Sequence, residues 1–167
     1  MRRECGELEQ FFTALNDIGV DGIMVGNLGT LKLARTLTKL PIQADHSFNL
    51  FNHLAATFLK ENGLTMATAS YELSFRQLRE IVENAVLPIE AVVHGAYESM
   101  ICDYNFPAMS LPAYNDLDSP ELLDTHYAFR DEAGGVHSIR IDQYGRSHIY
   151  FAKDLCLYPY LEKFNGL

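Results

Sequence analysis

The sequence predicts an α/β fold in which about four parallel strands form a partial, TIM-like (β/α) barrel and a small antiparallel meander follows near the C-terminus. Short apolar segments alternate with amphipathic helical segments over the first hundred residues. The predicted strands begin near residues 22, 42, 64 and 89, a spacing typical of repeated strand–helix units with right-handed crossovers. After residue 126, three strand-like segments are joined by glycine-containing turns, which indicates antiparallel pairing.

Each strand is predicted from a short apolar run, and each helix from apolar residues that recur at helical spacing. The strands are expected at residues 22–26, 41–45, 64–69 and 88–93. The helices are expected around residues 8–15, 31–37, 49–62 and 74–85. Ser74 and Gln77 form a capping-box pattern, which marks the start of the last of these helices.

The four strand–helix units amount to about half of an eight-stranded barrel. The sheet can stay open, a partner can complete it as a homo-oligomer, or the chain can belong to a longer protein whose outer strands lie beyond both ends, and we favour the last. We divide the chain into four parts: strand–helix repeats at 1–105, a proline-rich connection at 106–126, the meander at 127–152 and a terminal helix at 153–167. Asp154 is expected to cap that helix, and Pro159 to break or kink it.

The composition is that of an ordinary globular protein. The chain has 167 residues, of which 48% are hydrophobic and 21% charged. Its net charge of −9 weakens any general attraction to nucleic-acid backbones, while a local basic patch or a small-molecule pocket stays open. The three cysteines contain no Cys-x-x-Cys pair and favour free thiols in a reducing compartment. Because no apolar stretch suits a signal peptide or a membrane span, we expect a cytoplasmic protein without membrane contact.

In parallel-sheet folds, the loops after the carboxyl ends of the strands form the site, because the helices leave this rim of the sheet uncovered. Polar residues gather in these loops: Asn27 after the first strand; Asp45, His46, Ser47 and Asn49 after the second; Ser70, Tyr71 and Glu72 after the third; and His94, Glu98, Cys102 and Asp103 after the fourth. Asp, Ser and Asn also start helices for purely structural reasons. The set as a whole predicts a ligand site at this rim.

The stretch from His94 to Asp103 is the densest of these groups. In a helix, His94, Glu98 and Cys102 would lie on one face, a spacing suited to a divalent metal or to a thiolate–imidazole pair. Gly95 argues against a helix that begins before it. In that alternative, His94 only donates a hydrogen bond to a neighbouring backbone and Cys102 is a buried core thiol. A return of the chain to the rim would bring Cys156 near Cys102.

Several motifs have the form of a known family. The segment Glu90-Ala-Val-Val-His94-Gly95-Ala96 has the pattern Glu-x-Phe-x-His-Gly-Ala with Val in place of Phe, and Tyr71-Glu72-Leu73-Ser74 is similar to Arg-Glu-Leu-Ser. Residues 45–52 correspond to a polar run that ends in Asn-x-x-Asn, and residues 142–146 and 153–157 correspond to a late segment. With these motifs the chain resembles peptidase family U32, the collagenase-like proteases, over nearly its whole length.

The resemblance implies a barrel with an inserted meander and a hydrolase, a peptidase that acts on protein or peptide substrates. It also implies an alternative, since several relatives are iron–sulfur proteins that act in hydroxylating RNA bases or a quinone precursor. The chain would then be an RNA or metabolite modification or accessory protein. Those relatives place cysteines three and ten residues after the glycine of His-Gly-Ala, where this chain has Glu98 and Asn105. A complete iron–sulfur cluster is therefore not expected from this chain alone, whereas a divalent metal is a candidate cofactor.

These considerations assign candidate roles at the predicted rim. The catalytic candidates are His94, Glu72 and Glu98. The candidates for substrate binding are Asp45, His46, Asn49, Tyr71 and Asp103, and those for metal binding are Cys102 and Cys156. The peptidase is the first hypothesis, the RNA or metabolite modification protein the second, and a non-catalytic scaffold the third.

Overall fold

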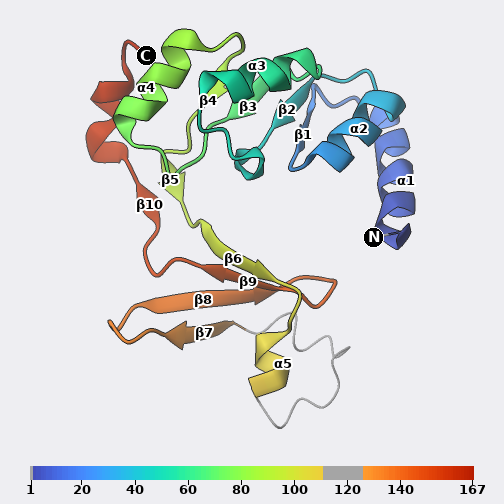
Figure 1. Ribbon diagram of the computed structural model, residues 1–167. Coiled ribbons are helices and arrows are strands. Elements are labelled where there is room, and N and C mark those ends of the chain that lie inside the picture. Colours follow the sequence, from blue (N-terminus) through green and yellow to red (C-terminus); the bar gives the residue numbers. More distant parts are fainter. Residues whose placement is uncertain (1, 111–125) are drawn as a thin grey trace. The chain divides into compact units, whose positions relative to one another are not determined.

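The computed structural model describes residues 2–110 and 126–167, with side chains from residue 6 onward. The chain forms two compact units, of which unit 1 comprises residues 1–92 and 162–167 and unit 2 comprises residues 93–161 (Figure 1). Each unit is described by itself. Within the described residues, no helix is long and apolar enough to cross a membrane.

Unit 1 is built from strands and helices that alternate along the chain. In chain order it contains α1 (Arg2–Ile18), β1 (Ile23–Val25), α2 (Leu28–Leu37), β2 (Ile42–Ala44), the 3-10 turn η1 (His46–Phe48), α3 (His53–Glu61), β3 (Met66–Thr68), α4 (Phe75–Asn84) and β4 (Ile89–Glu90). The four strands pair in parallel in the order β1-β2-β3-β4. The predicted parallel strands are therefore confirmed. Among the described residues they form an open sheet, so the predicted TIM-like barrel is not confirmed.

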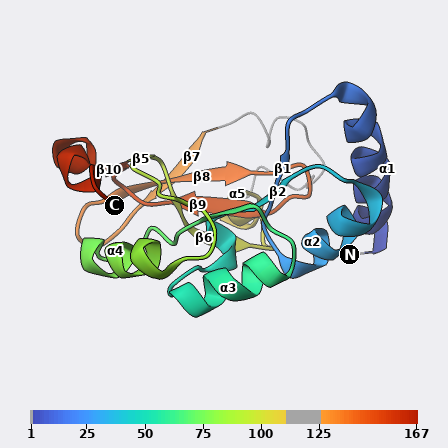
Figure 2. The ribbon, with the colours of Figure 1, turned by 90° about the horizontal axis from the view of Figure 1, so that it is seen from above.

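The helices of unit 1 cover one face of this sheet, and their order along the sheet follows the chain (Figures 1 and 2). Ala44 and Ala67 are fully buried in the core, and their small side chains let the helices approach the strands closely. Leu31 and Ala34 of α2 and Leu59 of α3 complete that core from the helix side. Among the described residues, β1 and β4 pair with one strand each, so both edges of the sheet are open.

The helix starts follow from local side-chain chemistry. Asn27, Asn52 and Ser74 each accept a hydrogen bond from a backbone N–H three residues later, which satisfies one of the orphan donors at the start of a helix. The capping box between Ser74 and Gln77 is confirmed. The helix expected from residue 49 begins later, because Asn49 adopts a left-handed conformation (φ 52°) that ends η1.

Unit 2 is mainly antiparallel. It contains β5 (His94–Gly95), β6 (Glu98–Cys102), α5 (Phe106–Ser110), β7 (Tyr127–Arg130), β8 (Val136–Ile141), β9 (Ser147–Tyr150), β10 (Leu155–Cys156) and the first part of the 3-10 helix η2 (Tyr158–Phe164). The main sheet has the order β6-β9-β8-β7, and β5 pairs with β10 in a second, two-stranded sheet. The predicted meander is confirmed and gains β6 as a fourth strand.

The structure excludes one of the two alternatives left open for residues 94–103, and it contradicts one expectation in unit 2. Residues 94–103 do not form a helix, because Gly95 has a φ of 137° and Glu98–Cys102 pairs with β9. The residues directly after Asp154 do not form the expected helix, since Leu155–Cys156 pairs with β5 instead. The 3-10 helix begins only at Tyr158, so Pro159 lies in its first turn, where a missing N–H costs nothing.

The connection expected at 106–126 is described only at its two ends. Phe106–Ser110 forms the short helix α5, and residues 111–125 lie outside the described residues.

Candidate active site

A carboxylate and two neutral polar groups form a cluster on three adjacent strands of unit 1. Glu90 at the end of β4 accepts two hydrogen bonds on Oε2, from Thr68 Oγ1 and from Gln43 Nε2, each 2.6 Å long. The Gln43 amide also lies 3.3 Å from Thr68 Oγ1. Thr68 is 3% exposed whereas Glu90 is exposed, so a buried hydroxyl anchors a carboxylate that solvent or a ligand can reach.

This cluster lies on the sheet face opposite to the helices. Side chains alternate between the two faces of a strand, and Val25, Ala44 and Ala67 belong to the core on the helix side. The strand register places Thr68 directly beside Glu90, so both project from the other face. The open face of the sheet therefore carries hydrogen-bonded acid–base and amide groups at the carboxyl ends of β3 and β4.

The loop after β2 is shaped by two of the predicted substrate-binding residues. Asp45 accepts the Ser47 N–H at 2.7 Å and so caps η1, while Asn49 closes that turn in the left-handed conformation. A Cβ atom at Gly26 would lie only 3.1 Å from Asp45 Oδ2, so the glycine lets the two loops approach each other. Both Asp45 and Asn49 thus have a clear structural role in positioning the rim.

Two other predicted residues meet at this rim. The rings of His46 and Tyr71 contact each other in a tilted arrangement, with their centroids 5.0 Å apart and 40° between their planes. The Glu72 backbone N–H donates to Ser70 Oγ at 3.3 Å, which fixes the loop after β3, and the Glu72 side chain is exposed. The structure therefore brings the rings of His46 and Tyr71 together at this rim, and their roles in substrate binding stay predictions.

His94 belongs to unit 2, whereas Glu72 belongs to unit 1. The His94 ring is exposed, and its Nδ1 lies 3.0 Å from the Leu155 carbonyl oxygen, so Nδ1–H donates and Nε2 is the acceptor of the neutral ring. The ring also stacks on Tyr158 at 5.0 Å. The backbone hydrogen bond is the structural alternative for His94, and its catalytic role stays a prediction.

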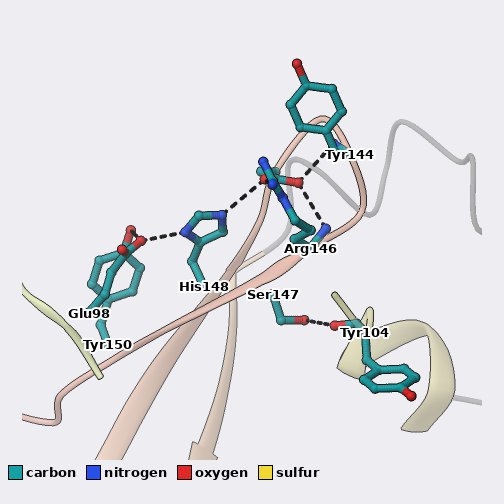
Figure 3. A network of polar contacts seen from close by, with 8 residues as sticks. Glu98, Tyr104, Tyr144, Arg146, Ser147, His148 and Tyr150 are labelled. Atoms are coloured by element: carbon teal, nitrogen blue, oxygen red, sulfur yellow. Dashed lines mark hydrogen bonds and ion pairs between the residues drawn. The ribbon is translucent and has the colours of Figure 1, made fainter. Parts of the chain in front are cut away.

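Glu98 is part of a network on the antiparallel sheet (Figure 3). Its Oε1 lies 2.5 Å from His148 Nδ1 and 3.3 Å from the Tyr150 hydroxyl, which donates to it. His148 Nε2 lies 3.2 Å from Asp142 Oδ2, which also accepts from Arg146 Nε at 2.7 Å. Because both ring nitrogens face carboxylate oxygens, which only accept, the contacts require the imidazolium form of His148.

The pKa values in this network follow from its contacts. Burial of Asp142 opposes its ionisation, but hydrogen bonds from Arg146 and His148 lower the pKa of this carboxyl to about 2. Burial likewise works against the charged form of His148, but the carboxylates of Glu98 and Asp142 outweigh it and raise the pKa of the imidazole. Burial and the negative charge of Glu98 raise the pKa of Tyr150.

The raised pKa of His148 gives the protein a pH-dependent stability. A group whose pKa is higher in the folded state contributes stability that is complete below its unfolded pKa and is lost as the pH rises through its folded pKa. We therefore expect the free energy of unfolding to decrease as the pH rises above about 6.5, the ordinary value of histidine, and through the raised pKa of His148. Urea denaturation at several pH values measures this slope.

The matched variant His148→Gln keeps a polar side chain but has no ionisable group, so its slope between these pH values should be smaller than that of the wild type. His53→Gln is the control, because His53 lies on α3 in unit 1 and is not part of the network around His148. The slope of this control should equal that of the wild type. Equal slopes for His148→Gln and the wild type would contradict the assignment.

The two cysteines proposed as metal ligands lie in different sheets. Cys102 in β6 pairs with Ser147, and Cys156 in β10 pairs with His94; both are free thiols. Asp103 follows Cys102 and is exposed. Among the described side chains, no group of three or more His, Cys, Asp or Glu residues is placed to hold a metal ion. The assignment of Cys102 and Cys156 to a metal stays a prediction.

The residues at the two cysteine positions of the iron–sulfur relatives do not fit a cluster. Glu98 is bound by His148 and Tyr150, and Asn105 Oδ1 accepts the Ala108 N–H at 3.0 Å and so caps α5. Both side chains have a local partner, and neither is a thiolate.

Sequence reasoning missed several residues of these two clusters. Gln43 and Thr68 are polar residues in short apolar strands, and this interruption was the available signal. Glu90 was noticed only as part of a motif. His148 and Asp142 belong to the predicted meander and its turn, and only the strand register brings them to Glu98.

Comparison with known proteins gives the class to which this fold and rim belong. Residues 1–103 match the family model described as "Peptidase family U32", and the chain belongs to this family. The resemblance seen in the motifs is thereby confirmed. No solved structure matches the chain.

Two curated relatives carry different names. The chain is 31% identical over 90 residues to "tRNA hydroxylation protein P1" of Bacillus subtilis (strain 168), covering 53% of this chain and 21% of the relative. It is 34% identical over 95 residues to "Uncharacterized protease MJ0090" of Methanocaldococcus jannaschii, covering 54% of this chain and 23% of the relative. The chain therefore spans between a fifth and a quarter of each of these relatives.

Proposed function

We propose that the chain is part of a U32 enzyme that modifies RNA bases and that unit 1 contacts the base. The cluster of Gln43, Thr68 and Glu90 carries the proposal. A carboxylate accepts hydrogen bonds from the amino and imino edge of a base, and a glutamine amide both donates and accepts in the same plane. The name of one relative states a reaction, tRNA hydroxylation, whereas the name of the other relative describes an uncharacterized protease.

The rim of unit 1 also offers aromatic surface. RNA is recognised mostly through unstacked bases, which stack on aromatic side chains and are hydrogen-bonded along their edges. The His46–Tyr71 pair supplies such a surface at the same end of the sheet as the polar cluster. Because the net charge of −9 weakens a general attraction to RNA phosphates, the proposal requires a local basic patch or other parts of the whole protein for the phosphate contacts.

Glu90 has the acid–base role in this proposal. Its Oε2 is fixed by Thr68 and Gln43, so the carboxylate is oriented before a substrate arrives. A carboxylate positioned in this way can take up the ring proton that the added oxygen atom replaces, while a co-substrate outside this chain supplies the oxygen atom and serves as the two-electron oxidant. Gln43 and Thr68 act through Glu90 as positioning residues.

A peptidase is the second candidate, favoured by the relative named as a protease. In that reaction the Glu90 carboxylate would act as a general base on water that attacks a peptide carbonyl. His94, Glu72 and Glu98 keep the acid–base roles predicted for them in this candidate, and the two reactions are distinguished by their products.

The test uses the whole protein in its own organism. The gene is deleted and restored as wild type, as Glu90→Gln or as Glu83→Gln, which changes an exposed glutamate of α4 and serves as the matched control. Total tRNA is digested to nucleosides and analysed by mass spectrometry. We expect the deletion to remove a nucleoside that is one oxygen atom heavier than its parent, and Glu90→Gln to restore less than about a hundredth of it.

Two results would overturn the proposal. The modified nucleosides could be unchanged on deletion while hydrolysis of unfolded protein by the purified enzyme is lost in Glu90→Gln, which would establish the peptidase. Alternatively, Glu90→Gln could match Glu83→Gln in both assays, which would remove Glu90 from the chemistry of either reaction.

A further inference from the structure

Positive charge is concentrated in one part of this acidic protein. Residues 22–60 contain four lysine or arginine residues and one aspartate, whereas the whole chain has a net charge of −9. The four cations are exposed: Lys32 and Arg35 on α2, Lys39 just after it, and Lys60 in the last turn of α3. None of the ion pairs found among the described residues involves them. We call these four residues the basic strip.

The fold brings cations of the two helices to one surface. Lys32 and Arg35 are three residues apart and share one face of α2. A Cβ atom at Gly63 would lie 3.4 Å from Arg35 Nε, so this side chain of α2 lies against the loop that follows α3. The Gly63 N–H donates to the Lys60 carbonyl oxygen at 2.9 Å, which keeps that loop beside the last turn of α3. Glu61, the residue after Lys60, lies about 100° further around the helix.

A cleft of about 390 Å³ lies near the start of α2, at the other end of this helix. Leu28 of α2 and Phe58 of α3 line it, together with Gly26 and Ser47 from the loops after β1 and β2. Leu28 is one helical turn before Lys32, so the basic strip begins next to the cleft. Ser47 belongs to the same 3-10 turn as His46, and the cleft is therefore part of the rim already described.

An accessible aromatic ring lies in this cleft. Phe58 is 49% exposed although it lines a concave surface. Proteins that bind single-stranded nucleic acid combine a positively charged path for the backbone with aromatic side chains on which bases stack. The basic strip and Phe58 supply these two elements side by side. The concave shape around the ring favours a single base over the flat surface of an anionic membrane.

We infer that the basic strip and the cleft bind a single-stranded segment of RNA that flanks the modified base. The inference rests on the proposed function and adds the phosphate contacts that the negative net charge of the whole chain leaves open. The four cations hold phosphates along α2 and the end of α3, and Phe58 stacks on a base in the cleft. Glu90 also belongs to unit 1, so one compact unit holds both the flanking strand and the reacting base.

The first test measures how salt weakens the binding of RNA to the full chain. The probe is a fluorescein-labelled single-stranded RNA of about 12 nucleotides and mixed sequence, followed by fluorescence anisotropy. In the triple variant Lys32→Gln/Arg35→Gln/Lys60→Gln, the slope of log Kd against log salt concentration should fall by about 2, since each contact to a single-strand phosphate contributes about 0.7. Circular dichroism verifies that the variant is folded.

The matched control for the charge is Arg76→Gln/Arg79→Gln/Lys153→Gln. It removes the same charge at three exposed positions outside the basic strip, and its slope should equal that of the wild type.

A second variant tests the cleft. Phe58→Ala should weaken RNA binding at least about fivefold and leave the salt slope unchanged, because stacking is lost while the phosphate contacts stay. Phe11→Ala is its matched control, because Phe11 lies on α1 and is 56% exposed. Equal binding by Phe58→Ala and Phe11→Ala would remove the aromatic contact from the inference and thereby overturn it.

Three other results would overturn the inference. The triple variant could keep the wild-type slope, its charge control could lose as much slope as the triple variant does, or the wild type could bind phosphatidylserine vesicles and not RNA. These outcomes are distinct from a failure of the proposed function. If RNA binding depends on the basic strip while Glu90→Gln restores the modified nucleoside in full, the RNA surface stands and the proposed role of Glu90 falls.

Discussion

Replacing Leu50 by alanine is expected to lower the free energy of unfolding by about 3 kcal/mol. Leu50 is fully buried and belongs to the core of unit 1. It forms a parallel bridge with Ala69, and its carbonyl oxygen accepts the Ser70 N–H at 3.2 Å. The substitution leaves a cavity where the loop after β2 meets the end of β3, and the surrounding core relaxes only in part.

The measurement is denaturant unfolding of the wild type and two variants. Leu54→Ala on α3 is the control, because Leu54 is 70% exposed and its truncation should change the free energy of unfolding by less than about 0.5 kcal/mol. Since typical domains are stable by about 5 to 15 kcal/mol, the effect at Leu50 is a large share of the total. Similar losses at both positions would show that Leu50 is not the centre of this core.

The second large effect is expected for Ser147→Ala, which should destabilise unit 2 by about 2 kcal/mol. The Ser147 hydroxyl donates to the Tyr104 carbonyl oxygen at 2.7 Å (Figure 3). Ser147 is fully buried, and its hydroxyl also accepts the Phe106 N–H. Alanine leaves both backbone groups without this partner in a buried position. The start of α5 would then lose its tether to β9.

Ser138→Ala is the matched control for this prediction. Ser138 lies on the neighbouring strand β8 and is exposed, so the same chemical change should have an effect within about 0.5 kcal/mol. Thermal unfolding followed by circular dichroism compares the two variants. A loss below about 0.5 kcal/mol for Ser147→Ala would mean that water or another group satisfies the backbone as well as the serine does.

The sequence predicted those parts of the fold that depend on local patterns. The four parallel strands appear as apolar runs, and the start of α4 appears in the pair of Ser74 and Gln77. The segment 94–103 was different, because the spacing of His94, Glu98 and Cys102 suits a helix equally well. Only its pairing with β9, about fifty residues later, makes it a strand, and a local pattern holds no information on that partner.

The sequence predicted the loops of the candidate site but not the contacts between its strands. The loops after β2 and β3 were found because polar residues follow apolar strands, and His46 and Tyr71 do meet there. Gln43, Thr68 and Glu90 come from three strands, and no spacing along the chain reveals that they share one hydrogen-bonded oxygen. Contacts that depend on sheet register become visible only once the register is known.

The tight turn between β8 and β9 has a consequence for the order of folding. Asp142 and Arg146 close this turn through backbone hydrogen bonds, and Asp142 Oδ1 also accepts the N–H groups of Tyr144 and Arg146. Such a hairpin closes a short loop and forms within microseconds, whereas β6 meets β9 only after a much longer loop has closed. The charged contact between Glu98 and His148 spans 50 residues and is therefore a late event. We therefore expect the β8–β9 hairpin of unit 2 to form first and β6 to pair with it afterwards.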